Sequence, residues 1–265
     1  MPTLFEEVVE DLAEEHGALD RVLEQLTPHQ YDLPTHAPGW AVRDQIAHLA
    51  QLDEVATLAI RNPDAFRSSI GQPATAEPGY LAKGRAMEPS ELLAWWRLAS
   101  SGLVAAARTL QPSARMPWYG PEMSGVSFIT ARLMEAWSHG LDVVDVVGIE
   151  RPDSDRLRHV AFLGVRTRPF SYVNRKMEPS RVPVRVSLTA PSGAIWELGE
   201  ESDENVVAGP ATDFCRVVTQ RRHVADTRLE IRGAAAEEWM GIAQAFAGPP
   251  GRGREPGEFA TEATG

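Results

Sequence analysis

Two histidines and one glutamate are the residues of this chain whose types and spacing best suit metal chemistry. Glu135 and His139 are four residues apart, so on a helix both side chains project from one face. His48, much earlier in the chain, offers a third ligand from a neighbouring helix. Two imidazoles and one carboxylate leave coordination positions open for water or a substrate.

The same spacing also has a simpler interpretation. A glutamate and a histidine four residues apart on a helix usually form a solvated pair. His48 lies in an apolar stretch, between Ile46 and Leu49, where a lone histidine is more often a hydrogen-bonded core residue. The spacing alone leaves both interpretations open, so the elements that carry these residues matter.

The N-terminal part is predicted to be helical, with His48 in the second helix and Glu135 and His139 in the fourth. Apolar residues recur at helical spacing over residues 4–26, 41–60, 89–110 and 124–147. Breaks rich in proline and glycine separate these segments, and residues 61–88 and 112–123 are expected to be loops. Four helices with long connections predict a four-helix bundle, the kind of fold that builds metal sites between facing helices.

The pattern changes after Pro152, where short alternating segments predict strands between helices. Helices are expected over residues 153–166, 211–220 and 234–246, and strands over residues 182–188, 194–198, 204–207 and 228–231. The fold class is therefore α plus α+β. We predict a bundle over residues 1–150, a smaller C-terminal α/β domain over residues 151–247 and a disordered, Gly/Pro-rich tail over residues 248–265.

The net charge and the composition limit the kinds of molecule that the protein is expected to bind. The 265 residues include 26 Lys and Arg against 37 Asp and Glu, a net charge of −11 that argues against nucleic-acid binding. No run of 18 apolar residues occurs, and the acidic N-terminus does not resemble a targeting signal. Cys215 is the single cysteine, which excludes an internal disulfide. We expect a cytoplasmic protein, a monomer or homodimer, without membrane or nucleic-acid partners.

Two segments resemble the DinB-like superfamily and, within it, the mycothiol-dependent maleylpyruvate isomerase group. They read Pro38-Gly39-Trp40-x-Val42-Arg43-Asp44-x-x-x-His48-Leu49 and Glu135-x-x-x-His139-Gly140-x-Asp142. The resemblance covers about residues 1–150 and implies a DinB-like metal-binding four-helix bundle, with His48, Glu135 and His139 at the positions of its ligands. Relatives place Thr or Ser after the tryptophan to cap the second helix. Here Ala41 takes that place, and Asp44 in the first turn offsets the loss.

The resemblance also implies a thiol cosubstrate, mycothiol or a similar low-molecular-weight thiol. A bound metal ion would hold that thiol as the nucleophilic thiolate. The expected function is a metal-dependent isomerase or transferase acting on a small electrophilic substrate. Zinc is preferred because it suits imidazole and accepts sulfur, while nickel and iron suit the same ligands. The alternatives are a non-catalytic metal-binding or sensor module, and a hydrolase or lyase that uses metal-bound water without a thiol.

The C-terminal half resembles small α/β domains appended to such bundles, including one described as wyosine-base-formation-like. The acidic charge argues against an RNA activity. Its basic cluster, Arg216, Arg221 and Arg222, is predicted to bind a carboxylate or phosphate of the thiol cosubstrate or of the substrate, the alternative being a solvated helix face. Cys215 beside it is expected to be a buried structural thiol.

Four further residues are candidates for a role beside the ligands. Asp142, one turn after His139, could hydrogen-bond a ligand imidazole or lie on the surface. Trp118, Tyr119 and Met123 lead into the fourth helix and could wall a pocket over the metal, or simply pack as a loop.

Overall fold

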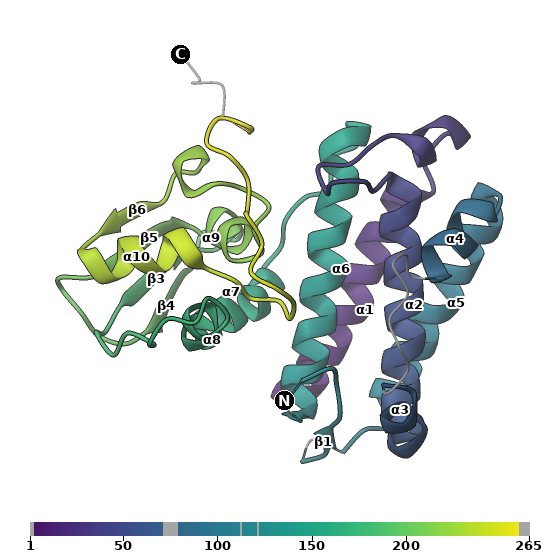
Figure 1. Cartoon of the computed structure of the whole chain (residues 1–265), viewed down its shortest axis with the longest axis horizontal. Coiled ribbons are helices and arrows are strands. Elements are labelled where there is room, and N and C mark those ends of the chain that lie inside the picture. The colour runs from purple at the N-terminus through teal and green to yellow at the C-terminus, as the bar shows by residue number, and fades with distance from the viewer. Residues whose placement is uncertain (1–2, 71–78, 112, 121, 260–265) are drawn as a thin grey trace. The chain divides into compact units, whose positions relative to one another are not determined.

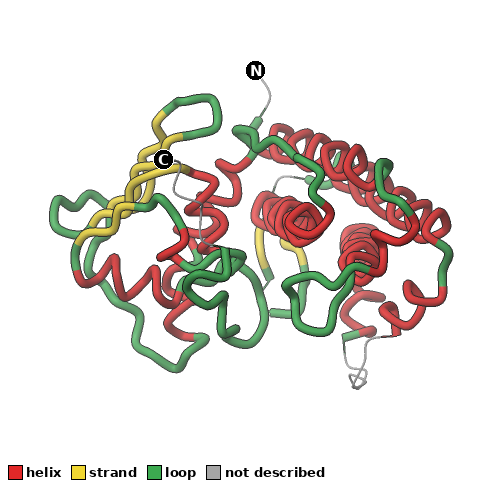
Figure 2. Tube along the Cα trace, turned by 90° about the horizontal axis from the view of Figure 1, so that it is seen from above, coloured by secondary structure: helices red, strands yellow, loops and turns green. Residues whose placement is uncertain are grey.

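The computed structural model describes residues 3–70, 79–111, 113–120 and 122–259 (Figure 1). The chain folds as two compact units, Met1–Arg151 and Pro152–Gly265. Figure 2 shows their different content, with the larger yellow sheet in the second unit and long red helices in the first. Within the described residues, none of the helices combines the length and the apolar character needed to cross a bilayer.

The first unit is a bundle of four long helices, which confirms the predicted fold class. These are α1 (Leu4–Leu23), α2 (Val42–Arg61), α5 (Pro89–Ala107) and α6 (Gly125–Val147). Helix α2 packs against both α5 and α6, and α1 packs against α6 and α5. The core between them is apolar and includes Leu19, Ile46, Leu92 and Val143. Burying these side chains is the main force that brings α2 and α6 together.

Helix ends are set by local capping. The Thr3 hydroxyl accepts a hydrogen bond from the Glu6 amide at 3.3 Å, and the Glu6 carboxylate accepts one from the Thr3 amide at 2.7 Å. Ser124 caps α6 in the same way, accepting from the Ser127 amide at 3.2 Å. Gly148 ends α6 with φ +70°, in the left-handed region. These caps satisfy backbone groups that helix ends leave without partners.

The prediction of a loop over residues 61–88 is wrong for most of that segment. It contains two short helices, α3 (Pro63–Ser69) and α4 (Gly79–Ala86), while residues 71–78 lie outside the described residues. The Asn62 side chain caps α3, accepting from the Ala65 amide at 3.0 Å, and Phe66 is fully buried. Helix α4 packs on α2. Helices this short depend on tertiary packing, which periodicity in the sequence does not reveal.

Short elements join the long helices of the first unit. A 3₁₀ turn, η1 (Pro28–Asp32), precedes α2. A two-stranded ribbon of β1 (Arg115–Met116) and β2 (Met123–Ser124) precedes α6 and pairs antiparallel. The residues between those two strands include Trp118 and Tyr119, so the ribbon positions the aromatic segment that leads into the ligand-bearing helix.

The second unit contains a mixed four-stranded sheet in the order β4-β3-β5-β6. The strands are β3 (Arg185–Thr189), β4 (Ile195–Gly199), β5 (Val206–Pro210) and β6 (Glu230–Arg232). Strands β3 and β5 run parallel and the other two pairs antiparallel. The helices are α7 (Leu157–Arg166), α8 (Arg168–Val173), α9 (Ala211–Val218) and α10 (Ala234–Ile242), with a 3₁₀ turn, η2 (Val224–Asp226). The predicted strands and helices are present within a few residues, whereas α8 was not predicted.

The C-terminal tail has contacts of its own over its described part. The amides of Gly257 and Phe259 donate to the Asp226 carboxylate at 2.8 and 3.4 Å. The Arg222 guanidinium lies 3.7 Å from the centre of the Phe259 ring. Disorder over residues 248–265 stays a prediction: residues 248–259 are described and include these contacts, and residues 260–265 lie outside the described residues.

Two glycines of the bundle should respond in opposite directions to alanine. Gly148 has φ +70°, and an added Cβ would meet nothing, so Gly148→Ala should cost about 1 kcal/mol of unfolding free energy through backbone strain alone. Gly102 lies within α5 with equally open space, so Gly102→Ala should stabilise by about 0.5–1 kcal/mol. Chemical denaturation of both variants measures this, and shifts of the same sign would contradict it.

Candidate metal centre

His48 on α2 and Glu135 and His139 on α6 converge in the first unit. Each offers a ligand atom, and these atoms all lie within 4.8 Å of one another. Oε2 of Glu135 lies 3.1 Å from Nε2 of His139 and 3.6 Å from Nε2 of His48. The side chains are only 13–16% exposed. The packing of α2 against α6 therefore brings together residues that are far apart in the sequence.

These distances fit a metal ion. Zinc binds imidazole nitrogen and carboxylate oxygen at about 2.0–2.2 Å, so two ligands of a tetrahedral ion lie about 3.4 Å apart. The observed separations of 3.1 and 3.6 Å bracket that value. The donor set, two nitrogens and one oxygen, is one that zinc, nickel and iron accept.

A chain of hydrogen bonds sets the tautomer of His139. The Thr35 hydroxyl donates to the Trp40 carbonyl at 2.9 Å, so its oxygen is free to accept from Nε2 of Gln45 at 2.9 Å. This orients the Gln45 amide with Oε1 toward Nδ1 of His139, at 2.6 Å. Because Oε1 only accepts, Nδ1 carries the proton and Nε2 keeps its lone pair. Nε2 is the atom that faces Glu135.

His48 is oriented by aromatic neighbours. Its Nδ1 lies 3.1 Å from the Tyr80 hydroxyl, supplied by α4. The Trp40 ring stacks on His139 with centroids 6.0 Å apart and lies 5.2 Å from His48. With Nδ1 engaged by Tyr80, Nε2 of His48 is the nitrogen that faces the carboxylate.

The protonation states suit metal ligands. Burial, together with the nearby His139, lowers the pKa of His48 to about 4, so this imidazole is neutral at neutral pH. Burial by itself raises the pKa of the Glu135 carboxyl. Its contacts with both imidazoles and the positive charge of Arg132 outweigh that effect, and the pKa of Glu135 is held well below its usual value. A neutral imidazole and an ionised carboxylate are the forms that bind metal ions.

Asp142 is not the hydrogen-bond partner of a ligand imidazole. Its carboxylate is buried, but Oδ2 lies 3.7 Å from Nδ1 of His139, beyond hydrogen-bond distance, and Gln45 takes that role. Sequence reasoning missed Gln45, although a polar side chain one turn before His48, beside the core residue Ile46, was a usable signal. Asp44 acts at the helix start, accepting from the Ala41 amide at 2.9 Å.

The aromatic segment before α6 packs near the triad through an arginine. Trp118 is buried and stacks on Phe66, with ring centroids 5.5 Å apart and planes 3° from parallel. The Arg132 guanidinium lies 4.8 Å from the centre of the Trp118 ring, and Nη2 lies 3.9 Å from Oε1 of Glu135. Tyr119 is 56% exposed, and Met123 belongs to β2. Sequence reasoning missed Arg132, although an arginine one turn before Glu135, next to Leu133 and Met134, was a usable signal.

The basic cluster lies in the second unit, at the end of α9. Nη1 of Arg216 lies 3.5 Å from Asp213, and Arg221 donates to the Thr219 carbonyl at 2.8 Å. Arg222 lines a small cavity of about 60 Å³ together with Arg175 and His223. Its role in binding a thiol stays a prediction.

Cys215 is fully buried in α9. Its thiol contacts the Leu157 carbonyl at 3.6 Å. Burial raises the pKa of this thiol well above its usual value, so it stays protonated and poorly nucleophilic.

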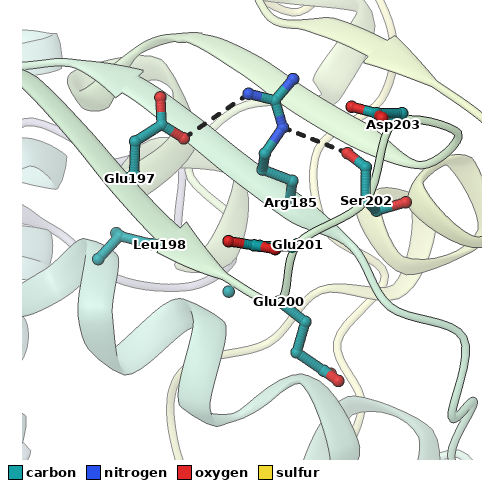
Figure 3. Close-up of a pocket in the computed structure, with 8 residues that line it drawn as sticks. Arg185, Glu197, Leu198, Glu200, Glu201, Ser202 and Asp203 are labelled. Atoms are coloured by element: carbon teal, nitrogen blue, oxygen red, sulfur yellow. Dashed lines mark hydrogen bonds and ion pairs between the residues drawn. The ribbon is translucent and has the colours of Figure 1, made fainter.

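A larger cavity of about 710 Å³ also lies in the second unit, along β4 and the turn that follows it (Figure 3). Arg185 is its basic residue, 3.9 Å from Glu197, and donates to the Ser202 carbonyl at 3.2 Å. Glu200, Glu201 and Asp203 make the rest of the lining acidic and largely exposed. None of the predicted site residues contributes to it.

A second buried polar pair, His16 and Asp53, crosses the bundle from α1 to α2. Nε2 of His16 lies 3.5 Å from Oδ2 of Asp53. Within the described residues, neither His16 nitrogen nor that oxygen has a hydrogen-bond partner. Burial lowers the pKa of His16 to about 4 and raises that of Asp53 to about 7. Folding therefore favours the neutral forms of both groups.

A triad of two imidazoles and a carboxylate between bundle helices defines the chain as a helical-bundle protein with a candidate metal centre. Residues 12–144, about half of the chain, match the family described as the mycothiol maleylpyruvate isomerase N-terminal domain. The chain belongs to this family. The matched range contains His48, Glu135 and His139.

Relatives extend over nearly the whole chain. Two proteins described as uncharacterized, from two strains of Mycobacterium tuberculosis, are each 40% identical over 250 residues, covering 93% of this chain and 97% of the relative. A crystal structure of the mycothiol-dependent maleylpyruvate isomerase superposes with a TM-score of 0.57 at 17% identity, covering 84% of this chain and 93% of that chain. A mutant of that enzyme superposes with a TM-score of 0.56 at 16% identity, with the same coverage. These two structures share the fold.

Replacing Asp53 should change how stability depends on pH. Its pKa is 3.8 when unfolded and about 7 when folded, so its stabilising contribution is present below pH 3.8 and is lost as the pH rises to about 7. Asp53→Asn lacks this titration. Its unfolding free energy relative to the wild type should therefore rise over that range, on the order of 2–4 kcal/mol.

Urea denaturation across that pH range measures the difference. Asp64→Asn is the matched control, because the Asp64 side chain is 94% exposed. Parallel pH profiles for the wild type and Asp53→Asn would show that Asp53 does not titrate as described.

Proposed function

We propose that the chain is a metal-dependent enzyme that activates a low-molecular-weight thiol of the mycothiol kind. The activated thiol adds to a small electrophilic substrate. In an isomerisation the thiol is expelled again, and in an S-transfer it stays bonded to the product. The observation that carries the proposal is the convergence of His48, Glu135 and His139 at distances that fit one ion. Membership of the mycothiol maleylpyruvate isomerase N-terminal domain family supports it.

Residues of this chain would hold the metal ion and orient its ligands. Nε2 of His48, Nε2 of His139 and Oε2 of Glu135 would hold the ion, and zinc is preferred over nickel or iron because it also accepts sulfur. When bound, the ion lowers the pKa of a thiol and so supplies the thiolate. Gln45 holds His139 in the tautomer that leaves Nε2 able to bind the ion, and Tyr80 orients the His48 ring.

The second unit is proposed to bind an anionic group. Arg216, Arg221 and Arg222 lie at one end of α9. Guanidinium groups recognise carboxylates and phosphates through paired hydrogen bonds, so an anionic group on the thiol or on the substrate is the ligand class that fits.

The solved structures named for mycothiol-dependent maleylpyruvate isomerase make isomerisation the first activity to assay. Activity with maleylpyruvate that requires mycothiol would support the proposal directly. Turnover that is indifferent to thiol would favour a metal-water hydrolase or lyase. A bound metal without turnover or thiol binding would favour a non-catalytic metal-binding or sensor module.

Removing any one ligand should abolish metal binding. We expect about one ion per chain in the wild type by elemental analysis, and loss of that ion in His48→Ala, Glu135→Ala and His139→Ala, because three protein ligands leave no spare donor. His29→Ala is the control, since His29 is exposed in η1. Circular dichroism checks that each variant folds. If the wild type takes up none of zinc, nickel and iron, the triad is a polar core network and the proposed function fails.

Gln45 should set metal affinity without touching the ion. Gln45→Leu removes the oxygen that accepts from Nδ1 of His139, at 2.6 Å, and should weaken zinc binding about 10–100-fold. Gln45→Glu keeps an acceptor oxygen at the same place and should retain most of the affinity. Competition with a chelator measures both values. Equal losses in the two variants would mean that packing, and not the hydrogen bond, is what matters.

A further inference from the structure

We infer that Arg132 is a positioning residue that holds one oxygen of Glu135 away from the two imidazoles. Glu135 then offers a single oxygen to the ion and leaves a coordination position open for the thiol. The inference rests on the proposed function, because it concerns how this triad receives a metal ion and a thiol.

The two carboxylate oxygens of Glu135 face different partners. Oε2 lies 3.1 and 3.6 Å from the Nε2 atoms of His139 and His48. Oε1 instead lies 3.9 Å from Nη2 of Arg132. One carboxylate oxygen thus faces the two imidazoles, and the other faces the guanidinium of Arg132.

Arg132 is itself held in place. It lies one helical turn before Glu135 on α6, and its side chain is only 4% exposed. The guanidinium lies over the Trp118 ring at 4.8 Å, and Trp118 packs edge-on against Phe128 and stacks on Phe66. A planar cation stacked on an aromatic face keeps a defined orientation. Arg132 therefore presents a fixed positive charge to Oε1.

The number of oxygens that Glu135 offers decides what the site can do. Zinc sites with four protein donor atoms are closed and structural, whereas sites with three protein ligands keep a position for water or substrate. If both oxygens bound the ion, the triad would supply four donor atoms. By engaging Oε1, Arg132 keeps the donor set at three. Its charge also offsets the second negative charge that a thiolate brings beside Glu135.

The test uses the full chain loaded with Co²⁺, with N-acetylcysteine as the thiol probe. The variants are Arg132→Met, which removes the cation, and Arg132→Lys, which keeps the charge. Arg151→Met is the matched control, because the Arg151 side chain is also 4% exposed in the same unit and pairs with Glu15 at 3.1 Å. Two readouts are taken: the thiolate-to-cobalt charge-transfer band during titration, and the infrared stretches of the Glu135 carboxylate, isolated by subtracting the Glu135→Gln spectrum.

We expect the wild type and Arg151→Met to show the wide carboxylate band separation of one-oxygen binding and to bind the thiol. Arg132→Met should retain Co²⁺, show the narrower separation of two-oxygen binding, and bind the thiol at least about tenfold more weakly. Arg132→Lys should recover most of the thiol affinity.

A wild-type spectrum with the narrow separation overturns the inference, whether or not Arg132→Met folds. So does an Arg132→Met protein whose carboxylate bands and thiol affinity equal those of the wild type. Either result leaves the proposed function standing when the titration shows that the wild type still binds Co²⁺ and the thiol. Failure of the wild type to take up Co²⁺ overturns the proposed function, and this inference with it.

Discussion

The largely buried carboxylate of Glu135 is the constraint around which the triad and its neighbours are arranged. An ionised carboxylate inside a helical bundle is costly unless charges and hydrogen-bond donors surround it. Here two imidazoles lie on one side and a guanidinium on the other. Because α6 carries two of these partners and α2 the third, the packing of α2 against α6 and the compensation of this charge depend on each other.

Several residues that support the site come from outside the four long helices. Thr35 and Trp40 belong to the turn before α2, Tyr80 to α4, and Trp118 to the segment between β1 and β2. Each contacts a ligand or a neighbour of a ligand. The long helices thus carry the triad together with Gln45 and Arg132, and the segments between them hold these side chains in place. This division is common in proteins, since connecting segments vary without disturbing the core.

The second unit shows how residues close together in the sequence take different roles. Cys215 and the basic cluster lie within a few residues of each other, yet the thiol is fully buried and held protonated while Arg222 lines a cavity. The acidic cavity along β4 has a larger volume, but it gathers exposed carboxylates around one arginine. Burial and partner charge, more than residue type, separate structural positions from candidates for binding.

The sequence by itself determined the four long helices, the strands of the second half and the Glu135–His139 pair on one helix face. Helical periodicity reports which face of each helix is apolar, and the spacing of Glu135 and His139 is a local property of one helix. Only the tertiary structure decided that His48 reaches them and that Gln45, not Asp142, accepts from Nδ1 of His139. It also decided that Arg132 faces Oε1 of Glu135, and that α3 and α4 form in a segment expected to be a loop. The physical reason is the same in each case, because these features depend on contacts between segments distant in the chain, and local spacing carries no record of them.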